Sequence, residues 1–202
     1  MRTVIPVLLV AFGVWAMAAQ RQRPAWDDLQ VFRENVEAPH ATLMVYATAL
    51  QAATGDRTQS PWYRSLNGQW KFHCSENPDG RPADFFRTEY DDSGWRTIPV
   101  PSNYQLHGCD IPIYTNTRYP FPQKPGGEPE VPKLKNSVGS YRRTFAVPGD
   151  WDGRRVFLHF DGVDSAFYLW VNGRKVGYNE DSRTAMYRFF GTWVLNQGAQ
   201  YA

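Results

Sequence analysis

Neighbouring carboxylates are the first candidates for chemistry in this sequence. Acidic residues occur singly or in adjacent pairs such as Asp91-Asp92 and Glu180-Asp181. Two carboxyl groups that act together must face each other across a substrate, about 5 to 9 Å apart in the glycosidases that use such a pair. Adjacent residues of one strand point to opposite faces, so Glu180 and Asp181 could not share this task. We therefore predict no catalytic residue in the chain.

Other catalytic motifs are absent from the sequence. It contains no Gly-rich phosphate loop, no G-x-S-x-G nucleophile elbow and no H-E-x-x-H zinc motif. Two cysteines and four scattered histidines do not give the spacing of a zinc site. His73 and His159 fall within predicted strands, and we interpret both as ordinary strand residues. The residues by themselves indicate a non-catalytic β domain.

Short alternating segments separated by turn residues predict the scaffold, an antiparallel β-sandwich. After the turn residues Asn67-Gly68, Trp70 and Phe72 alternate with polar neighbours. The dipeptide Asn172-Gly173 predicts a two-residue hairpin with positive φ at both positions. Further strands are predicted in RRVFLHFDGV and in GSYRRTFAVP, the latter ending at Pro148.

One long segment fits neither helix nor regular strand. VPSNYQLHGCDIPIYTNTRYPF, residues 100–121, is rich in Pro, Tyr and Asn and almost uncharged. Long loops of this kind are either disordered or are binding surfaces held on a scaffold. Proline lacks a backbone N–H, so we expect the region from Pro99 to Gly139 to run over the surface and not inside a sheet.

Composition limits the class of protein and of partner. The 202 residues carry a formal charge of +2, with 22 basic and 20 acidic residues scattered along the chain. This balance predicts no nucleic-acid partner. An aromatic content of 15% argues against disorder. Such residues suit a sandwich core, or a surface that stacks on flat apolar faces such as sugar rings.

The first residues have the layout of a secretory signal peptide. A basic Arg2 precedes an apolar run from Val4 to Trp15 and small residues around Ala18, after which we expect cleavage. The run is shorter than the ~20 residues of a spanning helix, so no stable membrane anchor is expected. Residues 1–18 are thus predicted to direct export to the periplasm or the medium.

Residues 19–61 follow as an irregular N-terminal arm, with a helical turn near Ala47 to Ala53. In an oxidising compartment Cys74 and Cys109 could form a disulfide, but their spacing does not establish one. A pair of buried, unbonded thiols fits the sequence equally well.

Four blocks, taken together, resemble the N-terminal jelly-roll domain of glycoside hydrolase family 2 β-galactosidases. They are SLNGQWKF, IPVPSNYQLHGCDIPIYTNTRYPF, GSYRRTFAVP and RRVFLHFDGVDSAFYLWVNGRKVGYNEDSR, in the family's order. The arm segment VFRENVEAPHATLMVYA is similar to the lead-in of large bacterial members. The resemblance implies an all-β, antiparallel jelly-roll β-sandwich of the galactose-binding-domain type, the family's sugar-binding domain, over residues 62–183.

The resemblance also implies two site residues. In the family, two loops of this domain reach the active site of a (β/α)₈ barrel, and their asparagine and aspartate correspond to Asn116 and Asp181. Both would bind the β-galactoside substrate, and Asp181 would help to hold a sodium ion with ligands from the barrel. An amide can donate to and accept from sugar hydroxyls, and a carboxylate suits a hard cation.

The similarity to the family stops after Arg183. Residues 184–202, TAMYRFFGTWVLNQGAQYA, are expected to be a divergent tail, foreign from near Ala185, which leaves the sandwich C-terminally incomplete through truncation or frameshift of a longer gene. The family's catalytic glutamates and magnesium ligands lie in the barrel. The chain alone is therefore expected to need no cofactor, to be inactive and marginally stable, and to expose the apolar residues Phe167, Leu169 and Val171.

Three functions remain open from the sequence. The first is the N-terminal domain of an exported β-galactosidase, which would hydrolyse terminal β-D-galactosides, work with the missing barrel and could form a homo-oligomer. The second is a free-standing, non-catalytic carbohydrate-binding module. The third is a fragment of a family 2 β-glucuronidase or β-mannosidase, which the YTN and GYNEDSR blocks favour less than the first.

Overall fold

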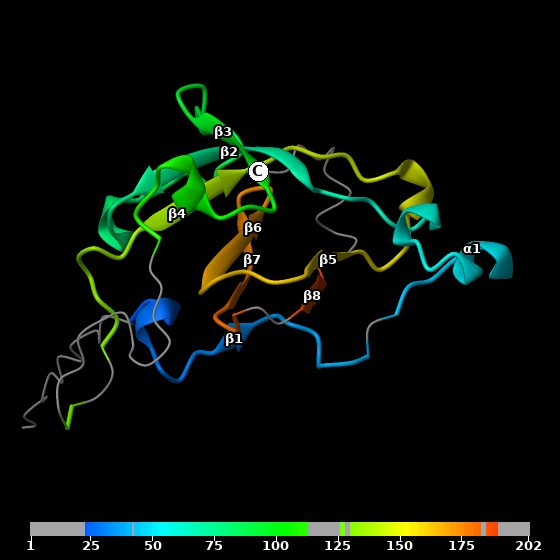
Figure 1. Cartoon of the computed structure of the whole chain (residues 1–202), viewed down its shortest axis with the longest axis horizontal. Coiled ribbons are helices and arrows are strands. Elements are labelled where there is room, and N and C mark those ends of the chain that lie inside the picture. Colours follow the sequence, from blue (N-terminus) through cyan, green and yellow to red (C-terminus); the bar gives the residue numbers. More distant parts are fainter. Residues whose placement is uncertain (1–22, 42, 113–125, 128–129, 183–184, 190–202) are drawn as a thin grey trace, which may run out of the picture.

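The computed structural model describes residues 23–41, 43–112, 126–127, 130–182 and 185–189. In these residues the fold is mostly β, with antiparallel pairing throughout and only short helices (Figure 1). The strands are β1 (Arg33–Glu34), β2 (Gly68–Ser75), β3 (Arg96–Val100), β4 (Val138–Arg142), β5 (Phe157–Phe160), β6 (Phe167–Val171), β7 (Arg174–Asn179) and β8 (Met186–Phe189). The helices are α1 (Ala49–Ala53) and the 3₁₀ helices η1 (Ala25–Asp27), η2 (Arg57–Gln59), η3 (Pro78–Gly80), η4 (Tyr104–His107) and η5 (Gly149–Trp151).

The first sheet has the order β3-β2-β4, with β2 in the centre. Phe72 of β2 lies opposite Arg96 of β3 and Tyr141 of β4. Its side chain is 1% exposed and forms a buried cluster with Ile98 and Cys109. The alternation after Asn67-Gly68 thus predicted this strand and its buried residue correctly.

The second sheet has the order β1-β7-β6 and contains the predicted hairpin. Asn172 and Gly173 connect β6 to β7 with φ values of 50° and 77°. Two positive φ angles match the right-handed twist of the flanking strands, which explains the Asn-Gly pair at this turn. A register shift between Leu169 and Trp170 interrupts the simple alternation of β6.

The third sheet joins β5 to β8, from Phe157 opposite Phe189 to Phe160 opposite Met186. Residues 186–189 lie in the segment for which the sequence predicted a divergent tail. Figure 1 shows β2, β3 and β4 along one side of the molecule, and β6 and β7 crossing from there toward β1.

The apolar core is small and divided. Seven hydrophobic residues are buried in the described part of the chain, and most fall into two clusters, one around Phe72 and one around Val156 and Val171. The expectation that β6 exposes its apolar face is therefore wrong at Val171, which is 2% exposed. Phe167 and Leu169 are half-buried, and the ring of Phe167 lies 5.0 Å from that of Phe160. Leu158 of β5 and residues of the segment before β5 pack against the cluster that contains Val171.

Two expectations about strand limits are also corrected. Pro99 lies inside β3, where it is paired with Gln69, and Gly139 lies inside β4. Proline is tolerated there because β3 is an edge strand of the described sheet, so no partner needs the missing N–H. The strand predicted to run to Pro148 ends at Arg142.

The arm is ordered by packing on the second sheet. Residues Arg33–Glu34 form β1 and pair with the end of β7, and Lys175 Nζ lies 2.6 Å from Glu34 Oε2. The expected helical turn is α1, whose first turn is capped by the Thr48 side chain. The predicted signal peptide, residues 1–18, lies outside the described residues. In the part that is described, no helix has both the length and the apolar character to cross a membrane.

Candidate functional site

Asp181 lies two residues beyond the end of β7, the central strand of the second sheet. Asn179, the last residue of β7, pairs with Phe167 of β6 on one side and with Arg33 of the arm on the other. The backbone N–H of Glu180 continues this pairing by donating to the carbonyl oxygen of Phe32 at 3.3 Å. The chain is therefore held from both sides up to the residue before Asp181.

Side chains around Asp181 brace its backbone. The Nδ2 of Asn179, a residue only 2% exposed, donates to the Asp181 carbonyl oxygen at 3.3 Å. The Tyr178 hydroxyl donates to Glu180 Oε2 at 2.8 Å, and burial together with this carboxylate raises the pKa of Tyr178. Ser182 Oγ donates to the Ser165 carbonyl oxygen at 3.3 Å. Asp181 is thus a partly exposed carboxylate on a fixed backbone.

Asn116, the other predicted sugar contact, lies outside the described residues. The residues on either side of its loop are described, and they lie together. Ser137 Oγ donates to Asp110 Oδ2 at 2.7 Å, and the Tyr104 and Ser137 hydroxyls are 3.1 Å apart. Next to them Cys109 is bonded to Cys74 of β2.

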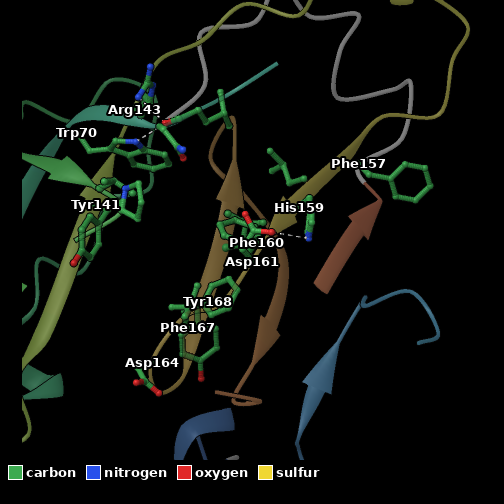
Figure 2. Close-up of a pocket in the computed structure, with 18 of the residues that line it drawn as sticks. Trp70, Tyr141, Arg143, Phe157, His159, Phe160, Asp161, Asp164, Phe167 and Tyr168 are labelled. Carbon is green, nitrogen blue, oxygen red and sulfur yellow. Dashed lines mark hydrogen bonds and ion pairs between the residues drawn. The ribbon is translucent and has the colours of Figure 1, made fainter. Parts of the chain in front are cut away.

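An aromatic groove opens between the first and second sheets (Figure 2). Its volume is about 3010 Å³, and its walls include Trp70 and Tyr141 on one side and Phe167 and Tyr168 on the other. Arg143 reaches the Leu66 carbonyl oxygen at 2.6 Å, and Trp70 Nε1 donates to the same oxygen at 2.8 Å. Desolvation raises the pKa of Tyr141 to about 12, so its hydroxyl stays protonated. Tyr178 and Glu180 also line this groove, whereas Asp181 is not part of its wall.

His159 lines this groove. It lies on strand β5, and the sequence predicted a strand at this residue. Its Nε2 is 3.6 Å from Asp161 Oδ1, and Asp161 Oδ2 is 3.6 Å from Arg57 Nη1 of the arm (Figure 2). Burial lowers the pKa of His159, with Asp161 opposing the shift. His73 lies on β2 beside Trp95, with ring centroids 5.4 Å apart. Both histidines pack within the fold, and His73 Nδ1 lies 3.3 Å from the hydroxyl of Ser75, two residues along the same strand.

The described residues do not form a metal site by themselves. No group of three or more His, Cys, Asp or Glu side chains lies close enough together in this part of the chain to hold an ion. Asp181 offers one carboxylate, whereas a hard cation takes six or more oxygen ligands when these come from protein and water. A cation at Asp181 would need most of its ligands from elsewhere.

Sequence reasoning missed two features that support the site. The arm strand β1 has only two residues, too few for any period to reveal it. The Cys74–Cys109 bond was left open, because pairing depends on a distance in space that spacing along the chain does not give. In the fold, Cys109 and Phe72 are buried in the same cluster, which brings Cys109 next to β2.

Comparisons with known proteins point to one family. Residues 63–197 match the model described as glycosyl hydrolases family 2, sugar binding domain, a range that runs past Arg183. A β-galactosidase of Priestia megaterium is 45% identical over 163 residues, which are 80% of this chain and 16% of that protein. A β-galactosidase of Psychromonas ingrahamii is 44% identical over 158 residues, 78% of this chain and 15% of that protein.

Among solved structures, a glycosyl hydrolase family 2 member from Bacteroides cellulosilyticus superposes with a TM-score of 0.45 at 25% identity. The superposition covers 68% of this chain and 16% of that one, and so low a TM-score supports no argument. The chain spans 15–16% of the length of the two β-galactosidases it matches.

Proposed function

This chain belongs to the sugar-binding domain family of the family 2 glycosyl hydrolases, and from that premise we propose that it serves as the jelly-roll domain of an exported β-galactosidase. In this proposal it binds the terminal galactosyl unit of a β-galactoside, and a barrel domain breaks the glycosidic bond. The observation that carries the proposal is the identity of 45% to a β-galactosidase across most of the chain.

The geometry around Asp181 supports a binding role. A carboxylate that must accept hydroxyl hydrogen bonds from a sugar gains from a backbone that is already fixed, because less freedom is lost on binding. Asp181 follows a hairpin held by β1 and β6, and Asn179 holds its carbonyl oxygen. Asn116 is the second contact of the proposal and would bind sugar hydroxyls through its amide.

The neighbouring acids Glu180 and Asp181 have different roles in this proposal, and neither breaks the glycosidic bond. Glu180 accepts a hydrogen bond from the Tyr178 hydroxyl at 2.8 Å, and the proposal assigns the sugar to its neighbour Asp181. We propose that a sodium ion also binds at Asp181, which would give one oxygen ligand, while the barrel would supply the others. Magnesium would bind in the barrel alone.

Export rests on two independent features of the chain. Residues 1–18 have the layout of a signal peptide. In addition, Cys74 and Cys109 are bonded, and such bonds persist in oxidising compartments and are rare in the cytosol.

A chimeric enzyme tests the proposed function. Residues 63–182 of this chain would replace the matching segment of the Priestia megaterium β-galactosidase, and hydrolysis of a chromogenic β-galactoside would be measured. We expect activity, and we expect Asp181→Asn to lower kcat/KM by about ten- to a hundred-fold, the cost of one hydrogen bond to a charged group. Asp150→Asn, a change at another exposed carboxylate, is the matched control and should leave kcat/KM unchanged.

An inactive chimera that is folded, as judged by its circular dichroism and melting curve, would contradict the proposal. So would an active chimera in which Asp181→Asn and Asp150→Asn have the same small effect. In the latter case the chain would belong to the family without using Asp181 for the sugar.

A further inference from the structure

The Cys74–Cys109 disulfide attaches η4 and the residues around it to the first sheet. Cys74 is on the central strand β2, opposite Gly139 of β4. Cys109 follows η4 and Gly108, whose φ of 73° reverses the chain. The bond therefore ties the stretch after β3 directly to the middle of the first sheet, with the two Cα atoms 5.7 Å apart.

The segment that the bond holds has little structure of its own. η4 is four residues of 3₁₀ helix, a form that rarely persists without tertiary support. Leu106, in its centre, is 74% exposed. Arg96 Nη1 reaches the His107 carbonyl oxygen at 2.5 Å, and His107 Nε2 is 3.1 Å from Ser102 Oγ, but both contacts are exposed to water. Exposed polar contacts of this kind contribute little to stability.

A hydrogen bond next to Cys109 joins the same segment to the start of β4. Asp110, the next residue, accepts from Ser137 Oγ at 2.7 Å, and Ser137 directly precedes β4. The hydroxyl of Tyr104, on η4, is 3.1 Å from the same Ser137 oxygen. β2, η4 and the beginning of β4 thus meet at Cys109, which is fully buried.

We propose that the Cys74–Cys109 disulfide is a local structural clamp that holds η4 and Asp110 against β2 and β4. The oxidised bond keeps the segment that ends at Asp110 next to Ser137, the residue before β4. Reduced, it leaves η4 held by the packing of Tyr104 on Phe72 and by exposed polar contacts, and releases Asp110 from Ser137, while the hairpin of β6 and β7 keeps its structure. The inference concerns only these described residues and does not depend on the proposed sugar-binding function.

The chemistry of the clamp is ordinary thiol–disulfide exchange. Formation removes one proton from each thiol and passes two electrons to an oxidised protein disulfide, which becomes a dithiol. With dithiothreitol, a reagent thiolate attacks one sulfur and forms a mixed disulfide. The second reagent thiol then displaces the remaining cysteine thiolate and closes a cyclic disulfide. Because Cys109 is buried, attack falls on Cys74 or requires local opening.

Two measurements on the mature full chain test the clamp. Alkylation in denaturant without reductant should label no cysteine, and labelling of both would overturn the inference at once. Hydrogen exchange of the oxidised chain and of the chain reduced with dithiothreitol would then be compared by mass spectrometry. We expect amides of residues 103–110 and 137–139 to exchange at least about ten-fold faster after reduction, whereas residues 167–179 stay unchanged.

Two further variants keep the test decisive. The double variant Cys74→Ser/Cys109→Ser should reproduce the reduced pattern with or without dithiothreitol. If this variant does not fold, Ser137→Ala in the oxidised chain replaces it, and should speed exchange at Asp110 and Val138 while η4 stays protected. Equal exchange in the oxidised and reduced chains would contradict the clamp. Faster exchange over the entire chain on reduction would also contradict it, because the bond would then stabilise the fold as a whole.

Discussion

The guanidinium of Arg142 donates from Nε to Asp92 Oδ2 at 2.8 Å and fastens β4 to the loop that leads into β3. Arg142 is only 7% exposed, and its Nη1 also donates to the Arg87 carbonyl oxygen at 2.8 Å and to that of Phe85. One buried cation thus satisfies several acceptors of a loop that has no regular structure. Trp95 of the loop packs against His73 of β2, and Phe85 contacts both Trp95 and Trp170 of β6.

Removal of the charge at Asp92 should weaken the fold, because it leaves the buried Arg142 without its counter-ion. We expect Asp92→Asn to lower the free energy of unfolding by about 2 to 3 kcal/mol. Asp91→Asn, at the exposed neighbour, should leave the free energy of unfolding nearly unchanged. Urea unfolding in sucrose, which stabilises folded chains, compares the two. Equal effects would show that Arg142 is held by the carbonyl oxygens alone.

The hairpin turn should tolerate no side chain at Gly173. Its φ of 77° disfavours every L-residue, although a methyl group would meet only the Phe86 carbonyl oxygen at 3.9 Å, an ordinary contact. Gly173→Ala should therefore cost about 1 to 2 kcal/mol from backbone strain alone. The matched control is Gly149→Ala, a position with space around it and no positive φ, where we expect no loss. A neutral Gly173→Ala in urea unfolding would contradict this reason for the Asn-Gly turn.

Tyr141 should make the fold sensitive to alkali. Burial raises its pKa to about 12, above the ordinary tyrosine value of 10.0, so the folded state binds this proton more tightly than the unfolded state. The contribution of Tyr141 is therefore fully present below pH 10 and is lost as the pH rises toward 12. Urea unfolding at pH 8, 9, 10 and 11 should show the decline, and Tyr141→Phe should reduce its slope. An unchanged slope would assign the loss to other groups, Tyr178 among them.

Much of the scaffold could be predicted from the sequence, because its signals are local. Alternation located β2, and the Asn-Gly pair located the β6–β7 hairpin. The strand limits near Pro99 and Arg142 were wrong because they depend on which strand lies at an edge and on what β4 packs against. The covering of Val171 could not be predicted, since it comes partly from Phe145 and Val147, which lie between β4 and η5, and from Trp151 of η5, where no period indicates burial.

The candidate site was predictable only in part. Asp181 is found at the end of a braced hairpin, as its loop position suggested, whereas Asn116 and the predicted boundary at residue 183 remain predictions. The disulfide and the arm strand β1 required the three-dimensional structure, because each joins segments that are distant in the chain: β1 pairs with β7, and the two cysteines are 35 residues apart.

The isolated chain should be only marginally stable. Its buried apolar residues are few and split between two clusters, and the wide groove between the sheets leaves Phe167, Tyr168 and Trp70 half-covered. We expect the purified mature chain to melt below about 45 °C and to bind the dye ANS strongly, as proteins with accessible apolar surface do. The chimera is the control, and the same segment within it should bind less dye. A cooperative melt of the isolated chain above about 60 °C would contradict this expectation.

The most direct test of the central claim is the rate at which the purified chain, free of any partner, cleaves a chromogenic β-galactoside. Since the proposal assigns bond cleavage to the barrel domain, we predict no turnover above the buffer rate at any chain concentration. A rate that rises in proportion to the amount of chain, and that persists through further purification, would place the bond-breaking residues in this polypeptide and contradict the account.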